Sequence, residues 1–427
     1  MKWILLLMLT AATAMLLWRS LTDVEEAGRT TLRYMAWGNP EQLAAEQEVI
    51  REFERRNPDV HVRLTLVPGS AYFQKLQVML ASGTATDVFR CDHFQFPAYA
   101  HRGYFMPLEG FIQDDPEFRF DDHFPQTIQE GMHEGQFQGL PVLFGSRNIW
   151  YNKTLFQKEG LEDPYTQYKR GEWTMERFLE AARRLTKFDE RGMATQFGVL
   201  ASPLDAWTFV WAFGGDILTP DGKRCIIDTP EAIEGLRLMR DLVYKWHVSP
   251  TTAESAMNAY TFESGRIAMF FQWAGQTPIY RKIRDFEWDV VPVPAGPRGR
   301  ISMLKGNQLI MYRHARHPQE AWRFMKFYVS RDAERILYVK LRRAMPTRKD
   351  VAFDPEFLGS SLPPFHNDIW VDLYRDGRPL PITDRWVHWQ RDWTDFYDLL
   401  MLGQLTPEEM VRQAAEAINR TLAEEPY

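Results

Sequence analysis

From Thr31 onward, apolar and polar positions follow a repeating strand and helix pattern. The apolar run at residues 31–37 and the alternating residues 60–66 predict strands, and residues 87–89 predict a third. Amphipathic stretches that end at Asn57-Pro58 and at Gly83 predict helices between them. A βαβαβ order of this kind favours an α/β fold with a largely parallel sheet.

The middle and the end of the chain are more helical. Four further helices are expected after short opening signals: Trp173-Thr174, Thr229-Pro230, His317-Pro318 and Thr406-Pro407. Strand-like runs return at residues 288–293 and 308–311. A chain of 427 residues exceeds what one hydrophobic core usually supports, so two domains are expected. Because we find no internal repeat and no flexible linker, the chain should cross between them in ordered segments.

Composition and charge reduce the number of functional classes to which the protein could belong. The net charge of −6 is modest and the signs are mixed, so a nucleic-acid partner is not expected. Cys91 and Cys225 form no disulfide framework and no metal site, and we interpret both as buried thiols. No cofactor and no metal centre are predicted. Aromatic residues make up 14% of the chain, with 15 Trp. Core packing accounts for about half of these Trp residues, and a carbohydrate site is one explanation for the others.

The N-terminus has the pattern of an export signal. Residues 3–18 carry no charge and follow Lys2. As a helix they would span roughly 24 Å, which is short of the ~30 Å hydrocarbon core of a membrane. Residues 1–29 therefore predict a signal peptide, with an uncleaved N-terminal anchor as the alternative. In either case the rest of the chain is expected in the periplasm or another extracytoplasmic space.

Several short segments follow one another in a specific order along residues 31–425, although each is a weak signal alone. The segments are Trp37, Phe53-Glu54-Arg55-Arg56-Asn57-Pro58, Ala81-Ser82-Gly83 with Asp87-Val88-Phe89, Gly139-Leu140-Pro141, Trp150-Tyr151-Asn152-Lys153 with Leu155-Phe156, Glu172-Trp173-Thr174, Phe213-Gly214-Gly215-Asp216, Phe262-Glu263-Ser264-Gly265-Arg266-Ile267-Ala268-Met269, Pro292-Val293-Pro294 and Met345-Pro346-Thr347-Arg348. In this order they resemble the extracellular solute-binding proteins of ABC sugar importers, the group that contains maltose-binding protein.

The resemblance implies a two-lobed periplasmic-binding-protein fold of the α/β class, with an interlobe cleft and several hinge crossings. One lobe would hold residues 30–140 and about 290–340, and the other about 141–289 and about 341–427. The implied function is that of a monomeric receptor, without enzymatic activity, that captures a carbohydrate in the cleft. The receptor would deliver its sugar, in the first place a neutral oligosaccharide, to the membrane permease subunits of an ABC importer.

The same resemblance selects candidate ligand residues. Trp37 and Asp92 each follow a predicted strand, where ligands of α/β proteins commonly bind. Trp207 and Trp211 are four residues apart and share one helical face, and Trp273 ends the apolar run at residues 267–271. Core packing is the competing interpretation for each Trp, and a turn or cap for Asp92. We expect Trp273 to be the main stacking residue.

Two departures from the family pattern leave the charge of the ligand open. Where the family usually has a glycine pair, this chain has Lys305, Gly306, Asn307 and Gln308, so Asn307 or Gln308 could contact hydroxyls and Lys305 could recognise a charge. Before Met345 stand Arg342 and Arg343, where the family tends to have a glycine. Arg343 and its neighbour could bind an acidic sugar such as a uronate, or they could be solvated surface residues.

Two rival functions remain at this stage. A glycoside hydrolase also combines aromatic rings with a pair of carboxyl groups, and Asp92 with Glu263 is the pair to consider. No Gly-x-Ser-x-Gly elbow, phosphate loop or His/Cys cluster supports other chemistry. The second rival is a receptor for a non-sugar solute.

Overall fold

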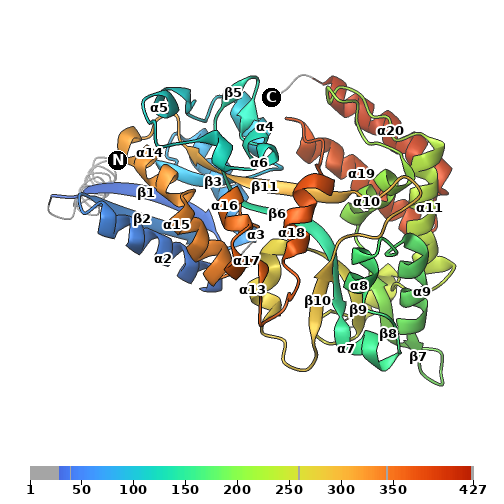
Figure 1. Cartoon of the computed structure of the whole chain (residues 1–427). Helices are drawn as coiled ribbons and strands as arrows, with labels where there is room; N and C mark the ends of the chain where they lie inside the picture. Colours follow the sequence, from blue (N-terminus) through green and yellow to red (C-terminus); the bar gives the residue numbers. More distant parts are fainter. Residues whose placement is uncertain (1–27, 39, 258–259, 343–344, 425–427) are drawn as a thin grey trace, which may run out of the picture. The chain divides into compact units, whose positions relative to one another are not determined.

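The computed structural model describes residues 28–38, 40–257, 260–342 and 345–424, which divide into two compact units (Figure 1). Unit 1 contains the chain up to Arg90 together with Met311–Tyr328, and unit 2 contains Cys91–Ile310 and the chain from Val329 onward. The chain thus passes from one unit to the other at three points. These points differ from the lobe boundaries expected near residues 140, 290 and 341, which stay a prediction.

The predicted export segment, residues 1–29, lies almost wholly outside the described residues. Within the ranges that the structure does describe, we find no helix that is both long enough and apolar enough to span a membrane.

Unit 1 has the parallel sheet that the sequence predicts. Strand β1 (Thr30–Trp37) pairs in parallel with β2 (Val60–Val67) on one edge and with β3 (Val88–Asp92) on the other. The helices of this unit are α2 (Pro40–Arg56), α3 (Gly69–Ala81) and α14 (Pro318–Tyr328). The three predicted strands and the two helices between them are therefore confirmed.

Helix α14 completes the core of unit 1, although more than 200 residues separate it from the other elements of that unit. The Phe324 ring lies 5.2 Å from both Phe53 on α2 and Tyr34 on β1, measured between ring centroids. The Tyr328 hydroxyl donates a hydrogen bond of 2.9 Å to Glu46, which also forms a fully buried ion pair of 3.1 Å with Arg90. The late segment is thus held by both apolar packing and a buried polar network.

Unit 2 is organised around the long strand β6 (Leu140–Asn152). One edge of β6 pairs antiparallel with β9 (Ile267–Trp273). The other edge pairs antiparallel with β11 (Ser302–Met311) along the first part of β6 and with β10 (Trp288–Val291) along its last four residues. Strand β8 (Ala194–Leu200) extends the sheet beside β9. The short strands are β7 (Lys187–Phe188) on β8, β12 (Gly377–Pro379) on β11, and the separate hairpin of β4 (Met132–His133) and β5 (Gln136–Phe137).

The helices of unit 2 begin where the sequence places their caps. The side chains of Thr174, Thr229 and Thr406 each accept a hydrogen bond from the first turn of the helix that follows, respectively α9 (Met175–Leu185), α11 (Pro230–Tyr244) and α20 (Pro407–Ala423). The longer helices are α9 (Met175–Leu185), α10 (Ala206–Phe213), α11 (Pro230–Tyr244), α18 (Asp368–Asp376), α19 (Trp386–Met401) and α20 (Pro407–Ala423).

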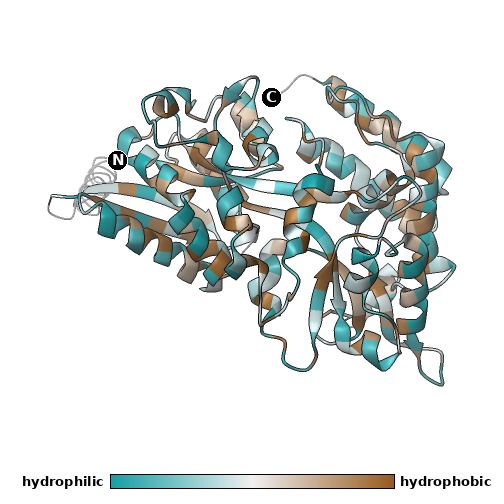
Figure 2. Cartoon of the chain, viewed as in Figure 1, coloured by the Kyte–Doolittle hydropathy of each residue, from teal (hydrophilic) through white to brown (hydrophobic). Residues whose placement is uncertain are grey.

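Short helices fill the connections of unit 2, and they are α4 (Phe96–His101), α5 (Glu109–Gln113), η1 (Phe120–Asp122), α6 (Pro125–Gln129), α7 (Lys153–Lys158), α8 (Pro164–Lys169), η2 (Pro203–Asp205), α12 (Thr252–Met257), η3 (Ala274–Gln276), α13 (Thr277–Tyr280), α15 (Arg331–Glu334), η4 (Arg335–Lys340), α16 (Lys349–Ala352) and α17 (Pro355–Leu358). Teal and brown residues alternate along α2 and α11 in Figure 2, as expected of helices that bury one side. Cys91 and Cys225 are both buried free thiols, as predicted.

One buried histidine in unit 2 has a pKa well below its ordinary value. His123 is 1% exposed, and its Nδ1 lies 3.0 Å from the Thr347 hydroxyl, which in turn donates to Glu334. Burial, helped by the positive charge of Arg348, lowers the pKa of His123 from 6.5 to about 4. The folded state therefore binds this proton less readily than the unfolded state does.

We predict that His123 makes the fold acid-labile. The contribution of the neutral His123 to the free energy of unfolding is complete above pH 6.5 and is lost as the pH falls toward 4. Over this range the free energy of unfolding should fall by up to about 1.4 kcal/mol per pH unit. His123→Asn keeps an N–H donor toward Thr347 but cannot titrate, so its urea midpoint should fall less between pH 7 and pH 5 than that of the wild type. Parallel pH dependence in the two proteins would show that His123 does not carry this effect.

Candidate functional site

The register of three neighbouring strands in unit 2 brings one aromatic and two cationic side chains together. Arg147 on β6 is paired directly with Trp273, the last residue of β9. On the other edge, Lys305 of β11 is paired with Gly145, two residues before Arg147. Directly paired residues, and residues two apart on one strand, point to the same face of a sheet. Trp273, Arg147 and Lys305 therefore share one face.

The distances agree with this register. The Lys305 Nζ lies 5.0 Å and the Arg147 Cζ lies 5.7 Å from the centroid of the Trp273 ring. Both values are within the range in which a cation is attracted to an aromatic face. Trp273 itself is only half-buried, so part of this residue remains accessible to solvent.

Each of the two cations is paired with a buried carboxylate. Lys305 Nζ lies 2.8 Å from Asp92 Oδ2, and Arg147 Nη2 lies 3.2 Å from Asp205 Oδ2. Asp92 is 6% exposed and Asp205 is 1% exposed. Because a buried carboxylate without a partner is very unfavourable, these pairs hold the four side chains in place. The polar groups beside Trp273 are thus fixed, and their charges are balanced.

A second aromatic side chain lies against the same lysine. Lys305 Nζ is 4.6 Å from the centroid of Phe94, which is half-buried in the loop after β3. The Phe94 ring stacks on Trp386 of α19, with centroids 4.9 Å apart and planes 8° apart. The Phe94 N–H donates to Asp92 Oδ1 at 3.1 Å, and the His93 N–H donates to the Gly306 carbonyl at 3.2 Å. The loop is therefore tied to β11.

We call Asp92, Phe94, Arg147, Trp273 and Lys305 the Trp273 cluster. It combines aromatic faces with hydrogen-bonding groups that are oriented by their neighbours. This arrangement suits a ligand that presents both a C–H surface and hydroxyl groups.

The amides that follow Lys305 have free hydrogen-bonding capacity. Asn307 is 8% exposed and Gln308 is 1% exposed. Among the described residues, Asn307 Oδ1 and both side-chain polar atoms of Gln308 find no hydrogen-bond partner. A buried polar atom in this state costs about 1–3 kcal/mol, so each atom is a natural position for a water molecule or a ligand group.

Trp37 belongs to unit 1, where it ends β1 and is half-buried. Its ring packs 5.0 Å from Tyr72 and 5.4 Å from Phe73, and the guanidinium carbon of Arg90 lies 4.4 Å from its centroid. Arg90 also donates to the Trp37 carbonyl. The indole is thus firmly oriented, and its role in ligand binding stays a prediction.

The structure places Trp207 and Trp211 in the core of unit 2 instead of at a surface. Trp207 is 0% exposed and packs 3.8 Å from Trp393, measured between ring centroids. Trp211 is 1% exposed, and its Nε1 donates to Asp216 at 3.3 Å. Their four-residue spacing does put both on α10, but this helix is buried on nearly every side. Neither ring offers a face to a solute in this structure.

Of the two arginines considered for an anionic ligand, the structure describes only Arg342. Arg342 donates to the backbone carbonyls of Glu356, Phe357 and Gly359, so its guanidinium is used within unit 2. Arg343 lies outside the described residues.

The carboxyl pair considered for hydrolysis lies too far apart. Glu263 is exposed in the turn before β9. Asp92 lies near the opposite end of this strand, because it forms an ion pair with Lys305, whose Nζ contacts the ring of Trp273. Seven strand residues span roughly 20 Å. Hydrolysis of a glycosidic bond requires carboxyl groups about 5–9.5 Å apart. Asp92 and Glu263 therefore cannot act together on one bond.

Sequence reasoning missed Phe94, Arg147 and Trp386. A charged residue within the apolar strand at residues 140–152 was a usable signal for Arg147, because a buried arginine requires a partner. Phe94 and Trp386 carried no such signal, since their stacking joins segments almost 300 residues apart.

Known proteins resemble this chain over most of its length. A protein of Brucella abortus named as a binding protein is 24% identical, covering 95% of this chain and 96% of its own. The maltotriose-binding protein of Pyrococcus abyssi is 22% identical over 78% of this chain and 70% of its own. The structure of an ABC substrate-binding protein from Listeria monocytogenes in complex with cycloalternan superimposes with a TM-score of 0.83 at 23% identity, covering 93% of this chain and 100% of that one.

The Listeria monocytogenes structure shares the fold of this chain, which confirms the predicted α/β class of periplasmic binding proteins. The model of one family matches residues 37–335, well over half of the sequence. This chain belongs to the bacterial extracellular solute-binding protein family.

Proposed function

We propose that this protein is an exported receptor that binds a neutral carbohydrate at the Trp273 cluster and delivers it, chemically unchanged, to the permease of an ABC importer. The observation that carries the proposal is the half-buried Trp273 ring between fixed polar groups. The names of two similar proteins support it, since one is a maltotriose-binding protein and the other was solved with cycloalternan. The receptor would act as a monomer outside the cytoplasm, with residues 1–29 as its export signal or anchor.

The chemistry of a sugar matches this cluster in two respects. A pyranose has a C–H face, which gains contact area and dispersion energy on an indole ring. It also has hydroxyl groups around its edge, which require donors and acceptors at defined positions. Lys305 and Asp92 supply a donor and an acceptor beside the ring, and the free Asn307 Oδ1 supplies a further acceptor on the same strand. Trp37 remains a proposed second stacking residue.

The balanced charges favour a neutral ligand over an acidic one. An anionic sugar that bound to Lys305 or Arg147 would have to compete with Asp92 or Asp205. Displacing either carboxylate would leave it buried and unpaired, which costs several kcal/mol. A neutral hydroxyl can share these groups without breaking the ion pairs.

We predict that neutral oligosaccharides stabilise the protein and that uronates do not. Maltotriose, longer linear and cyclic glucans and a trigalacturonate would be compared by thermal denaturation, where a ligand at 100 times its Kd adds about 2.7 kcal/mol. Chromatography should recover the bound sugar intact. Stabilisation by the uronate alone would favour the acidic-sugar alternative, and a response to no carbohydrate would favour a non-sugar solute. Cleaved sugar would indicate an enzyme.

Loss of the Trp273 ring should weaken binding of the best neutral sugar by at least about tenfold, or about 1.4 kcal/mol. The measurement is calorimetric titration of Trp273→Ala. Trp246→Ala is a matched control, because Trp246 is also half-buried in unit 2 and has the Lys245 Nζ 5.2 Å from its ring. Equal affinity in the wild type and in a folded Trp273→Ala protein would remove Trp273 from the site.

The Asp92–Lys305 pair should be energetically coupled. Lys305→Met leaves Asp92 buried without its ionic partner, and the double variant Lys305→Met with Asp92→Asn removes that unpaired charge. The loss in the free energy of unfolding of the double variant should therefore be smaller than the sum of the losses in the two single variants by more than about 1 kcal/mol. Urea denaturation of the four proteins gives this coupling. The pair Lys187–Glu159, at 2.9 Å, is much more exposed than Asp92–Lys305, so it serves as the control and should show little coupling. A value near that of the control would contradict the charge-balance argument.

A further inference from the structure

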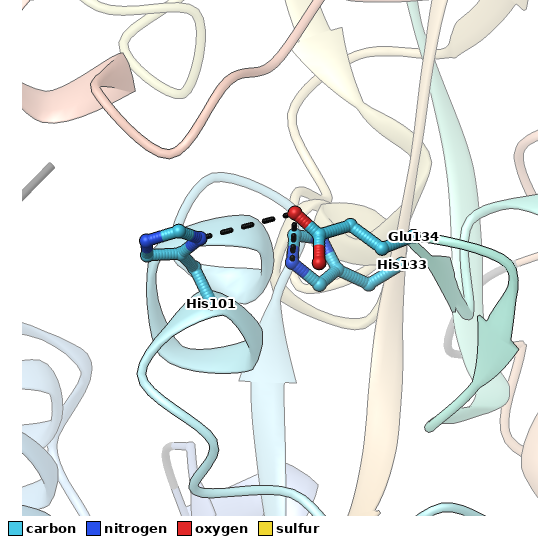
Figure 3. Close-up of side chains that lie close together, drawn as sticks. All are labelled: His101, His133 and Glu134. Atoms are coloured by element: carbon cyan, nitrogen blue, oxygen red, sulfur yellow. Dashed lines mark ion pairs between the residues drawn. The ribbon is translucent and has the colours of Figure 1, made fainter.

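Two histidines and one glutamate from separate elements of unit 2 direct their polar atoms toward one point. His101 is the last residue of α4, His133 ends β4, and Glu134 follows in the turn between β4 and β5. Figure 3 shows one nitrogen of each imidazole ring facing the same carboxylate oxygen of Glu134. This group lies outside the Trp273 cluster and has no part in the proposed sugar binding.

The hairpin turn fixes the position of Glu134. The turn has two central residues, Glu134 with φ of 48° and Gly135 with φ of 80°. Positive φ at both positions is the requirement of the tight hairpin turn that suits twisted strands. Glycine adopts this conformation readily, but a glutamate rarely does. The turn therefore places an unusual residue type beside His133.

The distances between the three candidate ligand atoms are slightly longer than those in a metal-bound site. His101 Nδ1 and His133 Nε2 each lie 4.0 Å from Glu134 Oε1, and the three ligand atoms all lie within 4.8 Å of one another. Ligands about 2.0–2.2 Å from a tetrahedral Zn²⁺ are roughly 3.4 Å apart, so inward movements of about 1 Å would suffice. The side chains of His101 and Glu134 are 39% and 75% exposed and can make these movements, whereas His133 is only 17% exposed.

Hydrogen bonding does not account for this group. At 4.0 Å, the two nitrogen–oxygen contacts are too long for hydrogen bonds. The Nε2 of His133 is buried and has no hydrogen-bond partner among the described residues. A bound ion would satisfy the buried nitrogen.

We propose that His101, His133 and Glu134 bind a divalent transition-metal ion of the Zn²⁺ class, with water completing its coordination. Two imidazoles and one carboxylate are typical ligands of Zn²⁺, Co²⁺ and Ni²⁺, whereas Mg²⁺ and Ca²⁺ prefer oxygen ligands alone. The ion would join the end of α4 to the β4–β5 hairpin. The sequence predicted no metal site, because more than 30 residues separate His101 from the other two ligands and no spacing motif connects them.

The test is calorimetric titration of the full chain with Zn²⁺ after removal of metals by a chelator. We expect one saturable site for Zn²⁺ and none for Mg²⁺. His101→Gln, His133→Gln and Glu134→Gln should each weaken Zn²⁺ binding by at least about tenfold. Removal of a residue that only hydrogen-bonds to a metal ligand already causes a loss of this size, so removal of a ligand should cause no less. Co²⁺ should give a visible absorption spectrum that these variants lose. His314→Gln is the control, because His314 is exposed and belongs to unit 1.

Circular dichroism and the urea midpoint will show whether each variant is folded. His101 is partly exposed and Glu134 is largely exposed, so their variants should fold even if His133→Gln does not. Absence of saturable Zn²⁺ binding to the wild type would overturn the proposal. Equal Zn²⁺ affinity in folded His101→Gln or Glu134→Gln, or an equal loss in His314→Gln, would do the same, since binding would then be adventitious.

Discussion

The pairing of β6 with β9 and β11 is the constraint on which the candidate site depends. A shift of one residue on either edge would turn Trp273 or Lys305 to the opposite face of the sheet. The register with β11 changes between Lys305 and Asn307, where β6 accommodates an additional residue near Leu143. Leu143 has a φ of 51°, and its N–H donates to the Tyr338 hydroxyl at 2.9 Å. This irregularity is typical of a β-bulge, a feature that commonly redirects side chains near binding sites.

Charge compensation follows from the same arrangement. The register places Arg147 and Lys305 on a face where they are nearly buried, so each requires a carboxylate close by. Asp205 and Asp92 meet this requirement, and they come from η2 and from the end of β3. The result is a surface rich in hydrogen-bonding groups beside an aromatic ring, on which the charges of Arg147 and Lys305 are balanced by those of Asp205 and Asp92. Such a surface can discriminate between solutes by the positions of their hydroxyl groups instead of by their charge.

Local signals in the sequence predicted much of the fold. The alternation at residues 60–66 corresponds to β2, and threonines placed before Met175, Pro230 and Pro407 mark the starts of α9, α11 and α20. These features depend on neighbouring residues, so periodicity and capping reveal them. The return of α14 to unit 1 could not be derived from local pattern, because its contacts with Phe53 and Tyr34 join distant segments.

The candidate site was less predictable for the same reason. The position of Trp273 at the end of an apolar run marked it correctly as the end of a strand, but the pairing of Lys305 with Asp92 joins residues 213 positions apart. Helical spacing placed Trp207 and Trp211 together without indicating that their helix is buried. His101, His133 and Glu134 likewise meet only because α4 and the β4–β5 hairpin are neighbours.

A crystal structure with the neutral oligosaccharide that binds most tightly would test the central claim most directly. The account predicts a pyranose ring on the accessible face of Trp273, at van der Waals distance from the indole, with the Asp92–Lys305 and Asp205–Arg147 pairs intact and hydroxyl groups hydrogen-bonded to the cluster. A sugar bound elsewhere with the Trp273 face uncovered, or a ligand that has displaced Asp92 from Lys305, would contradict it.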